Sequence, residues 1–458
     1  MIPEGVLNDL RAMLGERLST RKGDLANHGR SETWFPDMPP NAVAYPRDAD
    51  EVAAIVAACA ARGVPVIGWG AGTGLEGHGS APSGGVCVDF RDMAAVLEVW
   101  PEDMLVRVQP GCTREALNAA LRGTGLMFPV DPGADASLGG MASTRASGTT
   151  AVRYGTMRDN VRALQVALPD GRLIRTGSRA AKSAAGYDLT GLFVGAEGTL
   201  GLITELTLRL HGLPEAVSAA SCAFPTTEAA IGTVIAAMQM GVRPARIEYV
   251  DRATVAILNA QDGADLPDRP HLLLEFHGSE AGVAEDAARV GALADEAGAM
   301  GYRWATHPED RTALWSMRHR AYHSILASRP GAAAVVTDIC VPISRLGEAI
   351  AHAEAEIAAS GLPGPILGHV GDGNYHAALL IDRDSPEELS RAKQVSEALA
   401  RHALSLGGTI TGEHGIGMGK RHLMAAEHGD AWQVMGALKA ALDPLGVMNP
   451  GKVVPDPG

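Results

Sequence analysis

The sequence predicts an α+β fold with two large domains. In the N-terminal half, short apolar runs are separated by glycine-rich loops, and residues 202–210 alternate apolar and polar side chains as a half-buried strand does. Near Leu213 and Pro214 the pattern changes, and helical segments begin to alternate with strand-like ones. The expected helices lie at 227–240 and 284–297, and the expected strands at 245–250 and 272–276. This change indicates a second α+β domain from about residue 215.

Local signals define the elements of the first part. Asp48 is followed three residues later by Glu51, as in a capping box, and apolar residues then recur at helical spacing until Gly63. Thr113 is an N-cap for a second helix at 114–122. The expected strands are 64–68, 85–90, 163–168 and 172–176, the last two joined by a turn at Pro169-Asp170-Gly171.

Composition excludes several classes of function. The 458 residues carry 39 basic and 53 acidic side chains, a net charge of −14, so neither nucleic acid nor an anionic lipid surface is an expected partner. The five cysteines form no CxxC pair, which argues against a disulfide framework or a cysteine metal site. The longest apolar run, 52–61, is too short for a transmembrane helix, and no signal peptide is apparent. A cytoplasmic enzyme is expected, with peripheral attachment to the inner membrane left open.

The first glycine-rich loop follows an expected strand at 64–68. Such a loop allows backbone N–H groups to approach a pyrophosphate without interference from a Cβ atom. Gly72, Gly74 and Gly77 satisfy a GxGxxG pattern, but residues 78–85 contain glycine, proline and serine where a Rossmann fold needs a helix. The match to the dinucleotide fingerprint is therefore accidental.

Two further glycine-rich loops follow at 131–155 and 195–201. Three such loops in this order resemble the FAD-binding domain of the vanillyl-alcohol oxidase (PCMH-type) flavoproteins. Longer segments, namely 182–189, 337–342 and 449–452, resemble the FAD-dependent D-lactate dehydrogenases of the cytochrome type, with their relatives the glycolate oxidase D-subunits and D-2-hydroxyglutarate dehydrogenases. The resemblance extends from about residue 38 to Lys452.

The resemblance implies a domain plan and a non-covalently bound FAD. The plan has an N-terminal helical segment (1–37), a PCMH-type FAD-binding domain (38–214), a substrate- and metal-binding cap (215–425) and a C-terminal segment that returns to the flavin (426–458). The FAD-binding residues that it implies are Gly68, Gly70, Ala71, Gly72, Thr73, Gly74, Pro132, Gly133, Ala134, Ser137, Gly139, Gly140, Ser143, Ser147, Gly148, Tyr154, Gly155, Glu197, Gly198, Gly201, Ile203 and Asn449.

Histidines and a carboxylate suggest a metal site. His369 and His376 flank a glycine-containing turn, and a hairpin there would place them opposite each other. Glu413 and His414 supply a carboxylate and a third imidazole, and two imidazoles with one carboxylate suit Zn²⁺ or Mn²⁺. By resemblance, His369, His376 and Glu413 hold the metal and His414 is the catalytic base. Spacing alone leaves open the reverse, with His414 as the ligand.

The resemblance also implies which residues bind the substrate. Arg318 matches the arginine that binds the substrate carboxylate, and Asn374 is a second substrate-binding residue. D-2-Hydroxyglutarate dehydrogenases carry a lysine where this chain has Val336, and a polar residue where it has Ala377 and Ala378. These losses argue against a second substrate carboxylate and favour D-lactate.

The expected reaction is oxidation of a D-2-hydroxy acid, with D-lactate giving pyruvate. A bound cation lowers the pKa of the substrate hydroxyl, an imidazole takes the proton, and FAD accepts the hydride. Cytochrome c, a quinone or an electron-transfer flavoprotein would accept the electrons, and a homodimer is one option for the assembly. The alternatives are a glycolate oxidase D-subunit, a D-2-hydroxyglutarate dehydrogenase or, in another class, a metallohydrolase.

Overall fold

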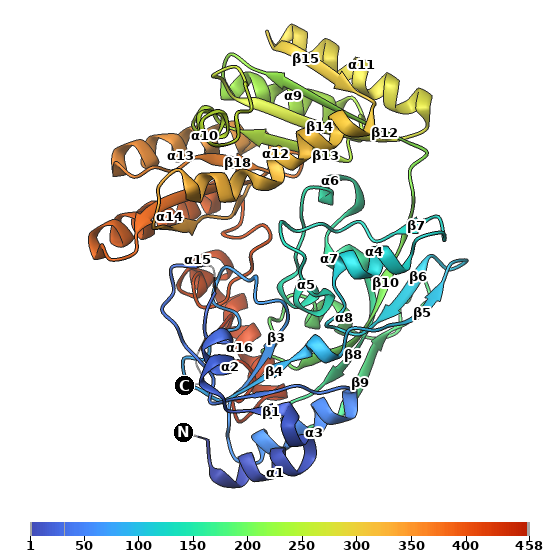
Figure 1. Cartoon of the computed structure of the whole chain (residues 1–458), viewed down its shortest axis with the longest axis vertical. Coiled ribbons are helices and arrows are strands. Elements are labelled where there is room, and N and C mark those ends of the chain that lie inside the picture. The colour runs from blue at the N-terminus through green and yellow to red at the C-terminus, as the bar shows by residue number, and fades with distance from the viewer. Residues whose placement is uncertain (1, 32, 456–458) are drawn as a thin grey trace. The chain divides into compact units, whose positions relative to one another are not determined.

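A computed structural model describes residues 2–31 and 33–455 (Figure 1). The chain forms two compact units, each described below by itself. The first comprises the chain up to Ser147, residues 155–213 and the chain from Glu413 onward, and the second comprises 148–154 and 214–412. Among the described residues, no helix is both long and apolar enough to cross a membrane.

The first unit begins with a small sheet of mainly parallel strands. Its order is β1 (Leu18–Ser19), β2 (Ala42–Ala44), β4 (Val86–Asp89) and β3 (Val66–Trp69), with β1 antiparallel to β2. Helices α1 (Glu4–Leu14) and α3 (Ala49–Ala60) supply buried side chains to its core. The expected capping of α3 is confirmed, because the Asp48 side chain accepts a hydrogen bond from the Glu51 amide.

The first unit also contains a second sheet, which is antiparallel and has five strands. Its order is β5 (Val96–Trp100), β6 (Leu105–Val108), β10 (Leu202–Arg209), β8 (Val161–Ala167) and β9 (Leu173–Gly177). The hairpin expected between 163–168 and 172–176 is confirmed as β8–β9. The smaller elements of this unit are α2 (Lys22–Asn27), α4 (Arg114–Ala120), α5 (Leu138–Thr144), α7 (Met157–Asn160), α8 (Leu189–Phe193), β7 (Leu126–Met127) and β11 (His211–Gly212).

Strand β10 differs from its expected half-buried form. Thr204 and Thr207 are buried, and only Glu205 and Arg209 keep appreciable exposure. The reason is its position: β10 has a neighbouring strand on each side and contacts both α3 and α5. The hydroxyl of Thr204 donates to the Gln165 side chain at 3.0 Å, so the buried polar group has a partner.

The C-terminal segment, with helices α15 (Met424–His428) and α16 (Asp430–Leu442), belongs to the first unit. The Lys439 ammonium donates to the carbonyl oxygens of Thr199 and Met448. The backbone N–H of Asn449 donates a hydrogen bond to the Val66 carbonyl oxygen at 2.9 Å. These bonds hold the end of the chain against the loop at 195–201 and against β3.

The second unit contains one large antiparallel sheet. Its order is β15 (Met300–Ala305), β12 (Ala216–Ala223), β14 (His271–Gly278), β13 (Arg246–Val250), β18 (Ile366–Gly368), β19 (Asn374–Asp382) and β16 (Ala332–Val336), and β17 (Ile339–Cys340) also pairs with β19. Its helices are α6 (Ala151–Tyr154), α9 (Thr227–Gln239), α10 (Arg252–Asp262), α11 (Glu280–Glu296), α12 (Pro308–Ala327), α13 (Leu346–Ser360) and α14 (Pro386–Ser405).

Helices lie on the sheet of the second unit and define its two faces (Figure 1). Val255 of α10 and Ile325 of α12 join a core cluster with Val250, Leu367 and Ala378. Alternate residues of a strand share a face, so Glu248 on β13 and His376 on β19 point to the side of α10 and α12. This face positions the candidate site.

Candidate active site

A buried carboxylate on β13 joins two of the predicted site residues. Both Nε and Nη2 of Arg318 contact Glu248 Oε2, at 2.8 and 2.6 Å. His369 Nδ1 contacts Glu248 Oε1 at 2.6 Å. Glu248 has no exposed surface. Burial alone would raise the pKa of its carboxyl, but the electrostatic interactions and hydrogen bonds with His369 and Arg318 outweigh burial and hold that pKa below its ordinary value.

The histidine hairpin is confirmed, although the two histidines do not lie directly opposite each other. His376 pairs with Leu367 across the β18–β19 ladder, and His369 accepts a backbone hydrogen bond from Asn374. The imidazole rings nevertheless meet edge to face, with centroids 5.4 Å apart and one ligand atom of each within 4.8 Å of the other. Gly373 has φ +85° in the turn, where any Cβ would collide with the Val341 carbonyl.

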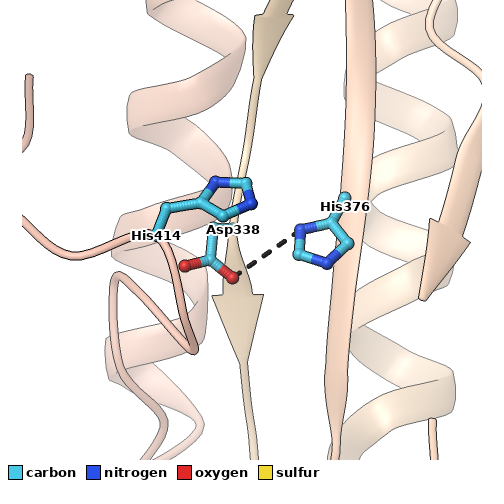
Figure 2. Close-up of side chains that lie close together, drawn as sticks. All are labelled: Asp338, His376 and His414. Carbon is cyan, nitrogen blue, oxygen red and sulfur yellow. Dashed lines mark ion pairs between the residues drawn. The ribbon is translucent and has the colours of Figure 1, made fainter. Parts of the chain in front are cut away.

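Asp338 is a second buried acid beside the predicted site residues of the second unit (Figure 2). Its carboxylate accepts hydrogen bonds from Asn374 Nδ2 at 2.8 Å and from Thr411 Oγ1 at 2.6 Å. It also forms an ion pair with His376 Nδ1 at 3.6 Å, drawn as the dashed line in Figure 2. His414, labelled in the same view, belongs to the first unit and is described with it below.

The hydrogen bonds at Nδ1 determine which nitrogen of each histidine can bind a metal. His369 Nδ1 lies on the Glu248 carboxylate, and His376 Nδ1 lies 3.2 Å from the Thr337 carbonyl oxygen. Because both of these partners are acceptors, a neutral imidazole at either position carries its proton on Nδ1 and its lone pair on Nε2. Two imidazoles held in this tautomer are what a divalent cation with nitrogen ligands needs.

Asn374, predicted to bind substrate, presents an unsatisfied acceptor. Its Nδ2 donates to Asp338 and to the Ile339 carbonyl, which fixes the orientation of the amide. Among the described residues, its buried Oδ1 has no hydrogen-bond partner. A buried acceptor of this kind is suited to a hydroxyl donor from a ligand.

The turn that carries Glu413 and His414 is held by the first unit. Glu413 Oε2 accepts a hydrogen bond from the Ser147 hydroxyl at 2.9 Å. The Glu197 carboxylate accepts from the amides of Ile416 and Gly417 at 2.7 and 2.8 Å, and His78 lies 3.4 Å from it. Burial would raise the pKa of Glu197, but His78 and these two amides lower it below its ordinary value.

The glycine-rich loops lie together in the first unit. Any Cβ at Gly70 would collide with Ser137 Oγ, so the first loop touches the second. The amide of Glu197 donates to the Ser143 carbonyl at 2.9 Å, which joins the third loop to α5. Asn449 Nδ2 donates to the Glu197 and His78 carbonyls. These contacts bring the three loops together in the first unit, and glycine-rich loops of this kind suit the pyrophosphate of a dinucleotide cofactor.

Most of the residues predicted to bind FAD lie in this part of the first unit. Gly139, Gly140 and Ser143 are on α5, Gly201 precedes β10 and Ile203 is within it. Four predicted residues are exposed: Ala71, Thr73, Gly133 and Ala134. Gly148 and Tyr154 belong instead to the second unit, where the Tyr154 hydroxyl contacts His277 Nδ1 at 2.7 Å. The others are Gly68, Gly72, Gly74, Pro132, Ser147, Gly155 and Gly198, all in the first unit.

Two functional candidates, Glu248 and Asp338, were missed by sequence reasoning. Glu248 interrupts an apolar strand, Ile247-Glu248-Tyr249-Val250, and a charged residue at the centre of such a strand is the signal that could have found it. Asp338 lies in a segment that carried the family resemblance, but its partners come from β19 and from Thr411, which no local pattern connects to it.

The buried side chain of Lys452 makes the packing of the C-terminal segment testable through the pH dependence of stability. Its ammonium is buried and donates to the Ser80 carbonyl and to Asn449 Oδ1, each at 2.7 Å. Burial lowers the pKa of Lys452 from 10.5 to about 8. Between these pH values the unfolded chain binds more protons than the folded chain, so Lys452 makes the free energy of unfolding rise with pH.

We therefore expect Lys452→Met to lose this rise. The difference in free energy of unfolding between wild type and variant, measured by urea denaturation, should change between pH 8 and pH 10 by up to the order of 3 kcal/mol. Lys182→Met, which removes an exposed lysine of the first unit, is the control and should leave the pH profile unchanged. Parallel profiles for wild type and Lys452→Met would contradict the prediction.

Comparisons with known proteins agree with this arrangement. A family model described as FAD binding domain matches residues 40–177, and one described as FAD linked oxidases, C-terminal domain, matches 213–453. A probable mitochondrial D-lactate dehydrogenase of Danio rerio is 46% identical over 456 residues, covering 98% of this chain and 92% of that protein. A mitochondrial D-lactate dehydrogenase [cytochrome] of Arabidopsis thaliana is 42% identical, with coverages of 99% and 81%. Glycolate oxidase subunit GlcD of Bacillus subtilis is 32% identical, with coverages of 98% and 97%.

Solved structures show the same fold at low sequence identity. p-Cresol methylhydroxylase with bound substrate has a TM-score of 0.81 at 18% identity, covering 99% of this chain and 98% of that one. 4-Ethylphenol oxidase from Gulosibacter chungangensis has a TM-score of 0.82 at 17% identity, with coverages of 100% and 99%. The predicted α+β, PCMH-type fold and the FAD cofactor are thereby confirmed. The chain belongs to the family of FAD-linked oxidases, together with the D-lactate dehydrogenases and the glycolate oxidase subunit.

Proposed function

We propose that this protein is an FAD-dependent D-lactate dehydrogenase that uses a divalent cation and passes its electrons to a cytochrome. The observation that carries the proposal is the convergence, on one face of the second unit's sheet, of a buried guanidinium, two imidazoles in the same tautomer and an unsatisfied amide oxygen. The names of the relatives from Danio rerio and Arabidopsis thaliana support D-lactate as substrate, and the Arabidopsis name supports the cytochrome. The other acceptors, the homodimer and the cytoplasmic location stay predictions.

In this proposal, Arg318 and Asn374 bind the substrate. The guanidinium of Arg318 is buried and supplies the positive charge that a carboxylate needs. Its Nε and Nη2 lie on Glu248, so Nη1 faces the substrate in our proposal. The Oδ1 atom of Asn374 accepts a hydrogen bond from the substrate hydroxyl, which orients the group that loses its proton.

A divalent cation fits the histidine pair. His369 and His376 would bind it through Nε2, because Nδ1 of each lies against an acceptor. Glu413 would add the carboxylate, since it directly follows Gly412, where a Cβ would meet Asn374 and Asp338. This set of two nitrogens and one oxygen suits Zn²⁺ or Mn²⁺. Such a cation, when bound, lowers the pKa of a coordinated hydroxyl.

Proton removal is assigned to His414. A neutral imidazole can take the hydroxyl proton as a general base. The hydrogen bonds of Glu197 to Ile416 and Gly417 hold the turn that follows His414 and so limit where its ring can lie. FAD, when bound, supplies the hydride acceptor.

The residues beside His376 favour a small apolar substrate tail. Val336 and Ala378 pair directly across β16 and β19, and Leu367 pairs with His376, so all three share the face of His376. Ala377 alternates with His376 along β19 and so points to the opposite face, where its apolar side chain does not bear on the tail. A methyl group suits this apolar surface better than a second carboxylate does, which favours D-lactate over D-2-hydroxyglutarate.

The first test is the visible spectrum of the purified protein during anaerobic addition of D-lactate. We expect a flavin spectrum that D-lactate bleaches within the mixing time, because hydride transfer reduces the bound FAD. L-Lactate, of the same size and charge, is the control and should leave the spectrum unchanged. A flavin that D-lactate leaves oxidised would contradict the proposed substrate. Faster bleaching by glycolate would instead favour the function named for GlcD.

A further inference from the structure

The carboxylate of Glu248 contacts two residues to which the proposed reaction gives different tasks, one binding the substrate and the other binding the metal. One oxygen receives Arg318 from α12 and the other receives His369 from the β18–β19 turn. We propose that Glu248 is a positioning residue that couples the substrate-binding arginine to the metal-binding histidine. This inference rests on the function proposed above and adds a residue to its machinery.

The division of the two carboxylate oxygens is the first argument. A carboxylate that served only to neutralise Arg318 could use both oxygens in a bidentate pair. Here Oε2 alone receives both Nε and Nη2 of Arg318, and Oε1 is given to His369 at 2.6 Å. Movement of Glu248 would therefore displace the guanidinium and the imidazole together.

A second histidine in the same unit gives an internal comparison. Glu275, on the neighbouring strand β14, also lies against a histidine and an arginine, with His277 Nε2 at 2.8 Å and Arg246 at 3.6 Å. The other nitrogen of His277 is engaged by the Tyr154 hydroxyl, so both of its nitrogens have protein partners. In His369 the carboxylate occupies Nδ1, and the ring meets the His376 ring edge to face. The carboxylate thus holds a ring that lies beside another candidate ligand, His376.

The balance of charge is the third argument. The single carboxylate of Glu248 faces one permanent cation, Arg318, and one imidazole whose Nδ1 forms a hydrogen bond with it. The pair with Arg318 is therefore neutral before a substrate carboxylate arrives, and Glu248 also raises the basicity of His369 as a metal ligand. Binding of the anionic substrate and binding of the cation would then respond to the same residue.

The test is the isosteric variant Glu248→Gln. Its amide offers one acceptor in place of two, so it can hold Arg318 or His369 but not both in their present orientation. We expect Zn²⁺ affinity, measured by competition with a chelator, to fall tenfold to a hundredfold. We also expect KM for D-lactate to rise by at least tenfold at saturating Zn²⁺, with a smaller change in kcat.

The matched control is Glu388→Gln. This variant breaks another glutamate–arginine pair of the second unit, with Arg329 at 2.8 Å, at a partly exposed position. It should leave both Zn²⁺ affinity and KM within twofold of wild type. If Glu248 served stability alone, Glu248→Gln would lower the melting temperature and also leave both quantities within twofold, which would overturn the proposal.

A double variant separates the effect of Glu248 on substrate binding from its effect on metal binding. If Glu248 acts on the substrate through Arg318, Glu248→Gln should raise KM much less in an Arg318→Met background than in the wild type. In the Arg318→Met background, Glu248→Gln should still lower Zn²⁺ affinity, because that effect depends on the contact with His369. Equal effects on KM in both backgrounds would overturn the proposal. Should Glu248→Gln not fold, Glu248→Asp keeps the charge and decides the question: both quantities must again worsen.

The proposed function can fail independently of this inference. In that case wild-type protein would bind no divalent cation or would not be reduced by D-lactate. A wild type that does both, beside a Glu248→Gln variant that retains both, would reject Glu248 alone.

Discussion

Replacing His414 with alanine is expected to lower the turnover of D-lactate by at least ~10²-fold while the protein keeps its full content of FAD. The loss follows from removal of the general base. The fold should survive, because the turn is held by bonds that do not involve the imidazole: Ser147 to Glu413, and Glu197 to the amides of Ile416 and Gly417. Stopped-flow reduction of the flavin measures the step directly.

The result also decides between the two roles that the sequence left open for His414. If His414 is the base, His414→Ala should keep wild-type affinity for Zn²⁺ and lose only the rate of flavin reduction. If His414 is instead a metal ligand, His414→Ala should lose Zn²⁺ affinity. His428→Ala, which removes a partly exposed histidine of the same unit, is the control and should match wild type in both. A His414→Ala variant that turned over normally would remove His414 from the mechanism.

Local chemistry made much of the fold predictable. The cap of α3 at Asp48, the cap of α4 at Thr113 and the hairpin around Pro169-Asp170-Gly171 each depend on residues within a few positions of one another. The expected hairpin between His369 and His376 was also correct, because its glycine-containing turn is a short-range signal. The register was not predictable in the same way, and His376 lies opposite Leu367 rather than His369.

Long-range pairing accounts for what the sequence could not provide. β10 looked half-buried because its alternation of apolar and polar residues is local, but its burial depends on helices from other parts of the chain. Glu248 lies 70 residues from Arg318 and 121 from His369, so no spacing rule links the three. Similarly, Gly148 and Tyr154 sit among glycine-rich loops in sequence yet belong to the second unit.

Removal of the divalent cation is the second change for which we expect a large effect. Dialysis against a chelator should lower turnover of D-lactate about 10³-fold, because a bound cation is expected to contribute several kcal/mol to ionisation of the hydroxyl, and each 1.36 kcal/mol is a factor of ten. The flavin should remain bound, since the loops that fit FAD lie in the first unit whereas His369 and His376 lie in the second. Addition of Zn²⁺ or Mn²⁺ in parallel samples should restore turnover and identify the metal.

Variants of the ligands distinguish loss of the metal from damage by the chelator. His376→Ala should show the turnover of the chelated protein and should not be rescued by added Zn²⁺, because one of two imidazoles is gone. His352→Ala removes a histidine of α13 whose ring contacts that of His402, with centroids 4.0 Å apart. This variant should respond to chelation and re-addition as wild type does. Full turnover after complete removal of metal would leave Arg318, Asn374 and His414 to activate the hydroxyl alone. In that case the tautomers imposed by Glu248 and Thr337 would have to serve hydrogen bonding to the substrate instead.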